Sequence, residues 1–416
     1  MRGVAIVGVG QTPRNPIWSR DTDLYSWKDI VIKASYEAIA DCTKGLNPKD
    51  IQFIVANYHG EGQIQAGGIG PVVSDMLGML PAGCLALCAN CTGGGVGIHE
   101  AYGLIASGRY DRILAVGFEK VYDLFNDGDK RALGGDVEFD YEFGFDHPTL
   151  QALHQMYAYR TWGKKRVLKA HVQYRGQSLW FAERNPSAAY YQAGFPWNQD
   201  ALMKMIDEMD DNDIFVPQEF WDKIPSTMLT DGCAAMILAP ADEALAYTDH
   251  PVYLDAVSYK SNAHLLSSQM HYPIPALENY DFEDFGSVRC AVADAYKHAG
   301  YGVERIDFME AYEPHVTSLI PMVTATQIRN SCSETIDFVL DGQTGYGGRL
   351  PCGTDGGRAI FGMTSGSNVG DGVVEVVKQM RGLAGERQLK KTDYAMVLGM
   401  QGQMASSSCA ILRNSQ

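Results

Sequence analysis

Apolar positions at helical spacing, followed by short apolar runs typical of strands, occur twice along the chain in the same order. The stretch AIADCTKGLNPKDIQFIVANY at 38–58 predicts an Ala-rich amphipathic helix that ends at a glycine, then a turn and a buried strand. The stretch AVADAYKHAGYGVERIDFMEAY at 291–312 repeats this pattern. The residues that match at one constant offset are Gly45 and Gly300, Ile51 and Ile306, and Phe53 and Phe308.

A second pair of stretches extends this repeat. YDRILAVGFE at 110–119 matches TDYAMVLGMQG at 392–402, and each follows a glycine-rich loop and a helix. The two loops are CTGGGVG at 91–97 and GMTSGSNVG at 362–370. Halves that alternate strands with helices predict βαβ units and mainly parallel sheets. We therefore expect an α/β fold of two duplicated halves related by a pseudo-twofold axis.

We place the first half at residues 1–245 and the second at 246–416. The first half carries an inserted loop region at about 120–230, where the composition shifts toward aromatic and charged residues. Within it, the pattern predicts a helix over 157–177 and a loop over 184–198. A long insertion commonly builds a substrate or partner surface, although a surface excursion without function is the alternative.

Composition and charge exclude several classes of protein. The chain has 416 residues, 46% of them hydrophobic, which is enough for a large core. A net charge of −16 and a pI near 5.0 argue against a nucleic-acid surface. Without a cationic leader or an apolar run of membrane-spanning length, we expect a soluble cytoplasmic protein. The nine cysteines form no regular framework, which favours a reducing compartment over a disulfide scaffold.

Cys91 is the strongest candidate for chemistry. It precedes a run of glycines and a predicted helix, and a helix N-terminus stabilises a thiolate through its unpaired N–H groups. The glycines also leave room for a substrate carbonyl beside the sulfur. A buried structural cysteine is one alternative. A metal site with Cys84 and Cys88 is another, but no second pair of ligands follows downstream, so we predict no metal.

Several stretches that follow one another along the chain resemble the thiolase superfamily. They are VAIVGVGQTP at the start, NCTGGG around Cys91, GRYDRILAVGFEKV after the next helix, ERNPSA at 183–188, TDGCAAMIL at 230–238 and GTDGGRAIFGMTSGSNVGDGV at 353–373. The resemblance is to the sterol-carrier or lipid-transfer type and covers nearly the whole chain. It implies the thiolase fold, with Cys91 as the nucleophile that attacks a 3-oxoacyl thioester, coenzyme A as co-substrate and no covalently bound cofactor.

The loops of the second half depart from the thiolase pattern. The loop that usually reads Asn-Glu-Ala-Phe or His-Asp-Ala-Phe places Tyr312, Glu313 and His315 here, and Tyr312 suits stabilisation of an enolate or carbonyl. His315 is the first candidate for the missing base, because imidazole titrates near neutrality. His59 and Glu313 are the other candidates. The alternatives are a packing histidine and an interior tyrosine without a catalytic role.

Two further positions lack the residues that thiolases use. The Gly-His-Pro loop has Met363 in place of the histidine, and a methionine cannot move a proton. Met396 occupies the position of the second catalytic cysteine. Only backbone donors near Leu398 and Gly399 remain for an oxyanion.

The resemblance leads to three competing functions. The first is a degradative thiolase that acts on a bulky or aryl 3-oxoacyl-CoA, most specifically benzoylsuccinyl-CoA, which would give benzoyl-CoA and succinyl-CoA. The second is a thiolase-like retro-aldolase that cleaves β-hydroxyacyl-CoA esters with tyrosines, and the third is a non-catalytic acyl-CoA-binding subunit. Aromatic residues of the insertion fit a large acyl group or a subunit interface: Tyr157, Tyr159, Trp162, Trp180, Phe181, Tyr190, Tyr191, Phe195 and Trp197.

Three binding expectations accompany the resemblance. Lys164, Lys165 and Arg166 form the best local basic cluster for a CoA phosphate, although a solvated helix face is the simpler explanation for them. Related enzymes often pair with a small zinc-ribbon and OB-fold protein that helps to hold CoA. We expect such a partner and a homodimer.

Overall fold

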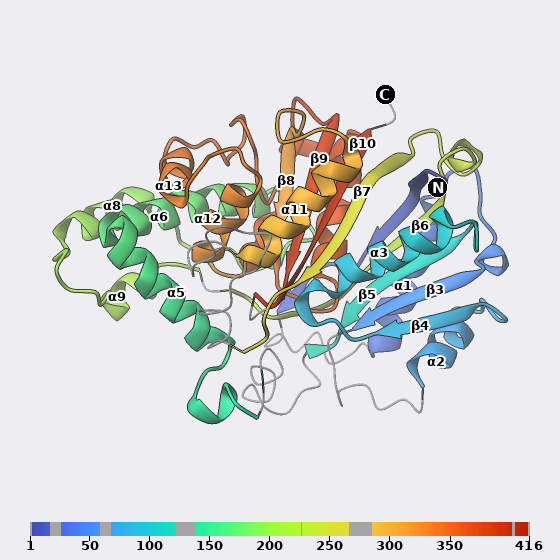
Figure 1. Cartoon of the computed structure of the whole chain (residues 1–416), viewed down its shortest axis with the longest axis horizontal. Helices are drawn as coiled ribbons and strands as arrows, with labels where there is room; N and C mark the ends of the chain where they lie inside the picture. Colours follow the sequence, from blue (N-terminus) through green and yellow to red (C-terminus); the bar gives the residue numbers. More distant parts are fainter. Residues whose placement is uncertain are drawn as a thin grey trace.

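The strands form one continuous sheet. The computed structural model describes residues 2–16, 26–58, 68–121, 136, 138–225, 227–265, 285–401 and 404–414, and in these residues the sheet has 10 strands (Figure 1). The strands are β1 Val4–Gln11, β2 Asn15–Pro16, β3 Phe53–Tyr58, β4 Gly83–Leu87, β5 Ile113–Glu119, β6 Thr230–Pro240, β7 Val252–Ser261, β8 Phe308–Ala311, β9 Tyr394–Met400 and β10 Ser406–Asn414.

The strand order mirrors itself about the middle of the sheet. It runs β4-β3-β5-β6-β1 and then β7-β10-β9-β8, and β1 pairs with β7 antiparallel from Val4 to Ile6. The repeated stretches form matching strands, β3 with β8 and β5 with β9. The prediction of mainly parallel sheets is wrong, because β6 and β10 run antiparallel to both of their main neighbours. Among the described strands, only β3 with β4 and β5, and β8 with β9, are parallel.

Helices cover both faces of the sheet. α3 (Gly93–Ala106) and α15 (Asn368–Met380) contact each other and strands from both halves. α1 (Trp27–Ala40) packs on β1 and β6, α2 (Ile69–Met76) on β4, and α11 (Gly286–Ala299) on β7 and β10. Alternate residues of β3 therefore enter different cores: Val55 packs with α3, whereas Ile54 and Ala56 pack with α1.

The two predicted helices that end at a glycine differ in detail. α11 is capped by Gly300, whose φ of +77° lies in the left-handed region that favours glycine. α1 ends earlier, at the cap residue Asp41, and Gly45 lies in the following turn with a φ of +98°. The repeat thus preserves the glycine but not its position relative to the helix end.

The inserted region is largely helical rather than a loop region: the helix predicted over 157–177 is confirmed apart from one break, whereas the loop predicted over 184–198 is wrong at one short helix. Its helices are α5 His147–Trp162, α6 Lys164–Ala182, α7 Ala189–Ala193, α8 Gln199–Glu208 and α9 Gln218–Trp221. Gly163, with a φ of +87°, separates α5 from α6. α7 falls inside the segment predicted as a loop. Residues 122–135 of the insertion lie outside the described residues.

The insertion packs on the second half through α6. This helix contacts the second-half helices α12 (Val316–Ala325), α13 (Cys332–Leu340) and α14 (Gly357–Phe361). Of the nine aromatic residues named above, Tyr191 is 48% exposed and the others have buried or half-buried side chains, whereas Phe143 and Phe215 of the same region are 78% and 75% exposed. The aromatic enrichment therefore largely builds the insertion's own core.

The remaining elements are short. They are η2 Pro48–Asp50, η3 Asn90–Thr92, η5 Tyr141–Phe143, η6 Ala244–Ala246 and η7 Gly385–Arg387. Among the described residues, no disulfide joins the nine cysteines. Among the helices described, none combines the length and apolar character needed to cross a membrane.

Candidate active site

Cys91 lies where β4 leads into α3. It belongs to the short helix η3, directly before Gly93, and its side chain is buried, with 6% of the residue exposed. Asn90 adopts a left-handed φ of +53°, and its side-chain oxygen accepts the Cys91 N–H at 2.7 Å. The sulfur is therefore carried by a tight turn at the N-terminus of a 14-residue helix, where a thiolate is favoured.

The glycines after Cys91 make room for protein rather than for substrate. A Cβ on Gly93 would lie 1.9 Å from the side-chain oxygen of Asn57, and one on Gly95 would lie 1.9 Å from Ser408 Oγ. On Gly94 it would lie 2.8 Å from the backbone nitrogen of Gly370. The glycine run lets the start of α3 press against β3, β10 and α15, which corrects the interpretation that it leaves space beside the sulfur.

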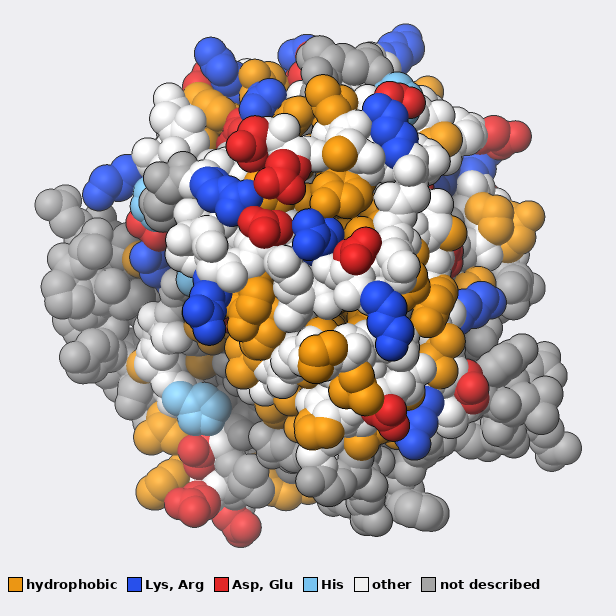
Figure 2. Space-filling view, turned by 90° about the vertical axis from the view of Figure 1, so that its right-hand side faces the viewer, with side chains coloured by type: hydrophobic (Ala, Val, Ile, Leu, Met, Phe, Trp, Pro, Cys, Tyr) orange, Lys and Arg blue, Asp and Glu red, His pale blue; other side chains and the backbone are white. Residues whose placement is uncertain are grey.

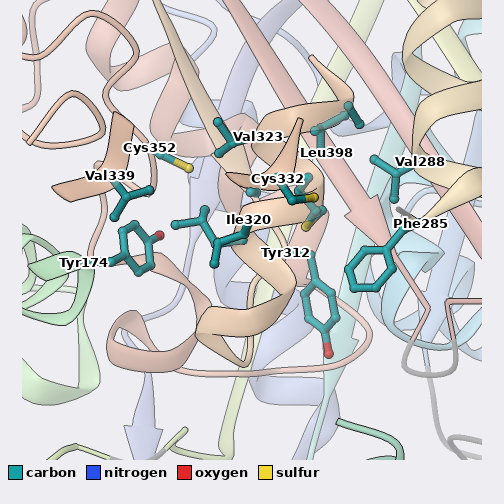
Figure 3. Packing of buried hydrophobic residues seen from close by; sticks show 14 of the residues in the cluster. Tyr174, Phe285, Val288, Tyr312, Ile320, Val323, Cys332, Val339, Cys352 and Leu398 are labelled. Carbon is teal, nitrogen blue, oxygen red and sulfur yellow. The ribbon is translucent and has the colours of Figure 1, made fainter. Parts of the chain in front are cut away.

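Tyr312 lies directly after β8 and its ring is buried. In Figure 3 its hydroxyl points away from the apolar side chains of Val323 and Leu398. Burial, and then the Cys91 side chain with which the hydroxyl forms a hydrogen bond, raise the pKa of Tyr312 well above its usual value. The same hydroxyl also lies 3.3 Å from the sulfur of Met363, so its one proton can be donated to either sulfur but not to both at once. Cys91, Tyr312 and Met363 thus form one cluster, with a phenol between two sulfur atoms.

The backbone of Met363 is held from both sides. Its N–H donates to the carbonyl of Met228 at 2.8 Å, and its carbonyl accepts the N–H of Thr230 at 3.0 Å. These bonds hold the backbone of Met363. This is the position where the resemblance places a catalytic histidine in related enzymes. The side chain is partly exposed, so it borders the cluster on the side nearer to solvent.

Glu313 makes contacts distinct from those of Tyr312. Its Oε1 accepts the backbone N–H of Arg358 at 2.7 Å, and its Oε2 lies 3.9 Å from Nη1 of Arg175. Burial raises the pKa of Glu313 to about 7, against the opposing effect of the two guanidinium groups. Gly357 is required beside it, because φ is +69° and a Cβ would lie 2.2 Å from Oε1. A carboxyl group with this pKa can give or take a proton near neutrality.

His315 is partly exposed and caps the N-terminus of α12. Burial, and then the nearby Arg175 and His315, lower the pKa of the imidazole of His171 on α6 well below its usual value. His171 packs on the ring of Trp221, with centroids 5.5 Å apart. The role of His315 as base stays a prediction. The other histidine candidate, His59, lies outside the described residues.

Leu398 and Gly399 lie in β9, next to this cluster. The carbonyl of Leu398 accepts the N–H of Tyr312 at 2.9 Å, and a Cβ on Gly399 would lie 3.1 Å from Thr92 Oγ1. Strand β9 therefore passes close to the residue that follows Cys91. Met396 is fully buried in the same strand, opposite Met309. The two oxyanion donors stay predictions.

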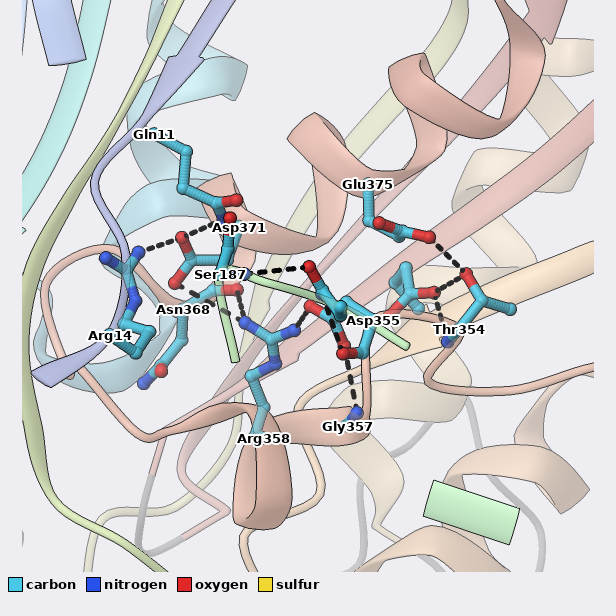
Figure 4. Close-up of polar contacts among 12 residues, drawn as sticks. Gln11, Arg14, Ser187, Thr354, Asp355, Gly357, Arg358, Asn368, Asp371 and Glu375 are labelled. Atoms are coloured by element: carbon cyan, nitrogen blue, oxygen red, sulfur yellow. Dashed lines mark hydrogen bonds and ion pairs between the residues drawn. The ribbon is translucent and has the colours of Figure 1, made fainter. Parts of the chain in front are cut away.

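A buried polar network supports the loop beside Glu313 (Figure 4). Asp371 of α15 accepts hydrogen bonds from Arg14 and Gln11 on one oxygen and from Ser367 on the other. Arg358 pairs with Asp355 and lies 3.4 Å from the second oxygen of Asp371. Both guanidinium groups are almost fully buried. The network connects the segment after β1 to α14 and α15.

The basic cluster of the insertion already has protein partners. The buried ammonium of Lys164 donates to the carbonyls of Asp210 and Asp213, and Lys165 donates to that of Asp207 at 3.1 Å. Arg166 pairs with Asp337 of α13 at 2.6 Å. A CoA phosphate would have to displace these contacts, so a role of the cluster in binding stays a prediction.

Within the described residues, no group of three or more His, Cys, Asp or Glu side chains is arranged to hold a metal ion. Cys84 is half-buried and Cys88 exposed, whereas Cys91 is buried. Burial raises the pKa of Cys84 to about 12, which disfavours the thiolate form that metals require.

Comparison with known proteins identifies the family. A family model described as "Thiolase C-terminal domain-like" matches residues 271–414. The acetyl-CoA acetyltransferase of Methanothermobacter thermautotrophicus is 28% identical and aligns over 97% of each chain. The chain belongs to the thiolase superfamily. The superfamily relatives support an acyltransferase.

Solved structures show the thiolase-like fold. The structure of the "Ltp2-ChsH2(DUF35) aldolase" has a TM-score of 0.76 at 17% identity and covers 100% of this chain and 98% of its own. A monomeric SCP2-thiolase-like protein from Mycobacterium smegmatis has a TM-score of 0.67, also at 17% identity, and covers 99% and 76%. The mirrored sheet thus belongs to a fold shared within the thiolase superfamily.

Proposed function

We propose that the protein is a thiolase that cleaves a bulky or aryl 3-oxoacyl-CoA with coenzyme A through an acyl-enzyme on Cys91. The observation that carries this proposal is the placement of the Cys91 sulfur at the head of α3 with the Tyr312 hydroxyl bonded to it. A helix N-terminus and a hydroxyl donor both stabilise a thiolate. A thiolate of this kind is the nucleophile that acyl transfer requires.

In the first half-reaction, the thiolate attacks the C3 carbonyl carbon of the substrate. The bond between C2 and C3 then breaks, its electron pair passes to the departing acyl-CoA as an enolate, and C2 receives a proton. In the second half-reaction, CoA loses its thiol proton and attacks the thioester on Cys91, which leaves again as thiolate. The proton given to C2 and the proton taken from CoA balance, so one acid–base group can serve both steps.

We assign the acid–base role first to His315, which is partly exposed and can exchange protons with solvent. Glu313 is the alternative, supported by its pKa of about 7. The hydroxyl of Tyr312 donates a hydrogen bond first to the thiolate of Cys91 and then to the developing enolate. The backbone near Leu398 and Gly399 is the proposed oxyanion site, supported by the close approach of Gly399 to Thr92.

The most specific substrate that we propose is benzoylsuccinyl-CoA, cleaved to benzoyl-CoA and succinyl-CoA in the breakdown of aromatic compounds in the cytoplasm. The loss of the usual histidine at Met363 sets this chain apart from thiolases of simple 3-oxoacyl chains. Purified protein supplied with this thioester and CoA should release benzoyl-CoA.

Mass spectrometry of Cys91 tests the reaction class. The wild-type chain, mixed with a 3-oxoacyl-CoA and no free CoA, should gain the mass of the acyl fragment on Cys91, and Cys91→Ala should not. Turnover of Cys91→Ala should fall by at least about a thousandfold. Cys352→Ala removes another buried cysteine and serves as the control. Cleavage that persists in Cys91→Ala without an acyl-enzyme rejects the thiolase mechanism.

A retro-aldolase acting on a β-hydroxyacyl-CoA is the second candidate. Two observations favour it: the hydroxyl of Tyr312 lies beside Cys91, and a thioether, that of Met363, stands where the resemblance places an imidazole. One of the structurally similar proteins described above is itself called an aldolase. This activity would survive in Cys91→Ala and disappear in Tyr312→Phe. A non-catalytic acyl-CoA-binding subunit would turn over neither substrate, alone or with a partner protein.

We propose a small zinc-ribbon and OB-fold protein as a partner, supported by the DUF35 component in the name of the structurally similar Ltp2-ChsH2 aldolase. We also propose a homodimer that forms along β4. This strand ends the sheet, pairs among the described strands only with β3, and carries Leu85 with 37% of its surface exposed. Figure 2 shows the face on the right of Figure 1, where β3, β4 and α2 lie, and apolar side chains gather in its lower centre.

A further inference from the structure

Arg175 is a buried cation that its protein surroundings do not satisfy. It lies on α6 with 3% of its surface exposed. Among the described residues, its Nε and Nη1 have no hydrogen-bond partner, and its Nη2 makes only a long contact of 3.5 Å with the carbonyl of Pro314. A buried guanidinium normally requires strong hydrogen bonds or a close counterion, because its desolvation costs several kcal/mol or more.

The acidic group nearest to Arg175 is only a loose counterion. Oε2 of Glu313 lies 3.9 Å from Nη1, within ion-pair range but beyond hydrogen-bond distance, and the hydroxyl of Tyr174 also lies close enough to Glu313 to lower its pKa. The other oxygen of Glu313 is held by the backbone N–H of Arg358. With a pKa of about 7, Glu313 is also protonated in part of the molecules at neutral pH. Arg175 and Glu313 thus face each other, and each has side-chain atoms without a hydrogen-bond partner among the described residues.

Arg175 and Glu313 lie near the place where the acyl part of a substrate is expected. Pro314, which Arg175 contacts, follows Tyr312 by two residues, so their Cα atoms are at most about 7 Å apart. Tyr312 touches Cys91, where the reacting carbon would lie. The phosphates of CoA are at the opposite end of the pantetheine arm from the thioester. An anion bound by Arg175 would thus lie beside the loop that carries Tyr312, on the acyl side of the thioester.

We propose that Arg175 binds a free carboxylate on the acyl part of the substrate, so that the enzyme selects 3-oxoacyl-CoA esters that carry a second acid group. This inference rests on the proposed thiolase function and narrows its substrate class. A carboxylate can accept two parallel hydrogen bonds from Nη2 together with either Nε or Nη1, so it would satisfy one of the two nitrogens left unpaired. Protonated Glu313 would donate its own hydrogen bond to the same carboxylate, so that only one negative charge remains beside Arg175.

A matched pair of substrates tests this selectivity in the wild-type protein. 3-Oxoadipyl-CoA and 3-oxohexanoyl-CoA have acyl chains of equal length and differ in whether a carboxylate or a methyl group ends the chain. We expect kcat/KM for the charged substrate to exceed that for the neutral one by at least about 100-fold, since a site built for a polar group rejects an analogue without it. A ratio near one, or a preference for the neutral chain, would overturn the inference.

Arg175→Met should abolish this preference, lowering the ratio of the two kcat/KM values by at least about 100-fold. Arg175→Lys keeps the charge but not the planar fork, so its ratio should lie between those of wild type and Arg175→Met. Arg184→Met, a change of the same type just beyond the end of α6, should leave the ratio unchanged. An equal loss for both substrates would make Arg175 a residue of general importance and reject carboxylate recognition.

The outcomes separate this inference from the function on which it rests. If wild type cleaves neither these thioesters nor benzoylsuccinyl-CoA and forms no acyl-enzyme with any of them, the thiolase proposal itself fails. If wild type cleaves both at similar rates, the thiolase proposal stands and only the role of Arg175 fails. The comparison in wild type remains decisive even if the Arg175 variants do not fold.

Discussion

The hydroxyl of Tyr312 lies 3.3 Å from the sulfur of Met363 and also forms a hydrogen bond with the side chain of Cys91. A phenol whose pKa is raised by burial stays protonated at neutral pH, so it can donate a hydrogen bond but is a poor base. The group beside the nucleophile therefore stabilises negative charge, and proton removal must come from another residue.

Tyr312→Phe should lower turnover by about a hundredfold, because the donor to the thiolate and the enolate is lost while the ring still fills its site. The alkylation of Cys91 by iodoacetamide at pH 7 should slow about tenfold, since less thiolate is present. Stopped-flow assays and mass spectrometry measure the two rates. Tyr296→Phe removes a hydroxyl bonded to the carbonyl of Thr326 and should alter neither rate. An unchanged alkylation rate in Tyr312→Phe would contradict the bond to Cys91.

Met363→His places an imidazole beside the cluster. A neighbouring imidazole forms an ion pair with a thiolate, so alkylation of Cys91 at pH 7 should become at least several-fold faster. Met363→Leu keeps the apolar volume and should change the alkylation rate less than twofold. The same iodoacetamide assay compares both variants with wild type. Equal rates for the histidine and leucine variants would show that position 363 does not face the sulfur.

The raised pKa of Glu310 predicts that the stability of the fold depends on pH. Burial, and then the charge of Glu375, raise the pKa of Glu310 from 4.5 to about 8, while Thr354 donates two hydrogen bonds to Oε1. The folded protein therefore holds a proton that the unfolded chain releases. This stabilisation is complete below pH 4.5 and is lost as the pH rises toward 8. Glu310→Gln should remove it, so that the variant gains stability relative to wild type as the pH increases from 5 to 8.

Thermal unfolding of both proteins at several pH values measures this difference. Glu386→Gln, at a site where the side chain is 82% exposed, provides the control and should follow wild type throughout. A difference in Tm between Glu310→Gln and wild type that stays constant from about pH 5 to pH 8 would refute the assigned titration.

Asp371→Asn should strongly destabilise the fold. Asp371 bonds to Arg14 and faces Arg358, and both guanidinium groups are buried. Removing the charge leaves two buried cations with a weaker partner, which costs about 3–5 kcal/mol of unfolding free energy. Asp111→Asn breaks the half-exposed pair with Arg2 and should cost less than about 1 kcal/mol. Denaturant titration measures both, and similar values for the two variants would argue against the network.

Leu85→Lys should convert a dimer into a monomer. A lysine on an edge strand opposes pairing with another strand, because the charge would be buried in the interface. Leu383→Lys changes a leucine that is 64% exposed and lies outside the strands of the sheet, so it should keep the oligomeric state. Sedimentation velocity distinguishes the two species. A dimer that persists in Leu85→Lys would exclude β4 as its interface.

Much of the fold could be predicted from the sequence because the repeat preserves apolar periodicity. The matched stretches that contain Phe53 and Phe308 became the strands β3 and β8, and those that contain Gly117 and Gly399 became β5 and β9. The helix predicted over 157–177 is confirmed by α5 and α6, apart from the break at Gly163, whereas α7 lies in the segment predicted as a loop. No local signal in the sequence shows that charged residues of α6 such as Lys164 and Arg175 are buried, because they contact segments distant in the chain.

The candidate site was predicted less completely. Sequence order placed Cys91 before a helix and Tyr312 after a strand, but it gave no sign that Arg175 lies against Pro314 or that Glu313 meets Arg358. Arg175 was missed because a single arginine within a helix resembles any solvated position. Its unpaired nitrogens become visible only when burial is known.

The sequence by itself determined the duplicated order of strands and helices and the location of a cysteine at a helix start, because both depend on local periodicity and on residues adjacent in the chain. The tertiary structure decided which groups surround that cysteine and whether each charge is buried. It also decided that the glycines after Cys91 touch Asn57, Gly370 and Ser408. Such contacts join segments far apart in the chain, and desolvation, which sets the pKa of Glu313 and the need of Arg175 for an anion, exists only after these segments pack together.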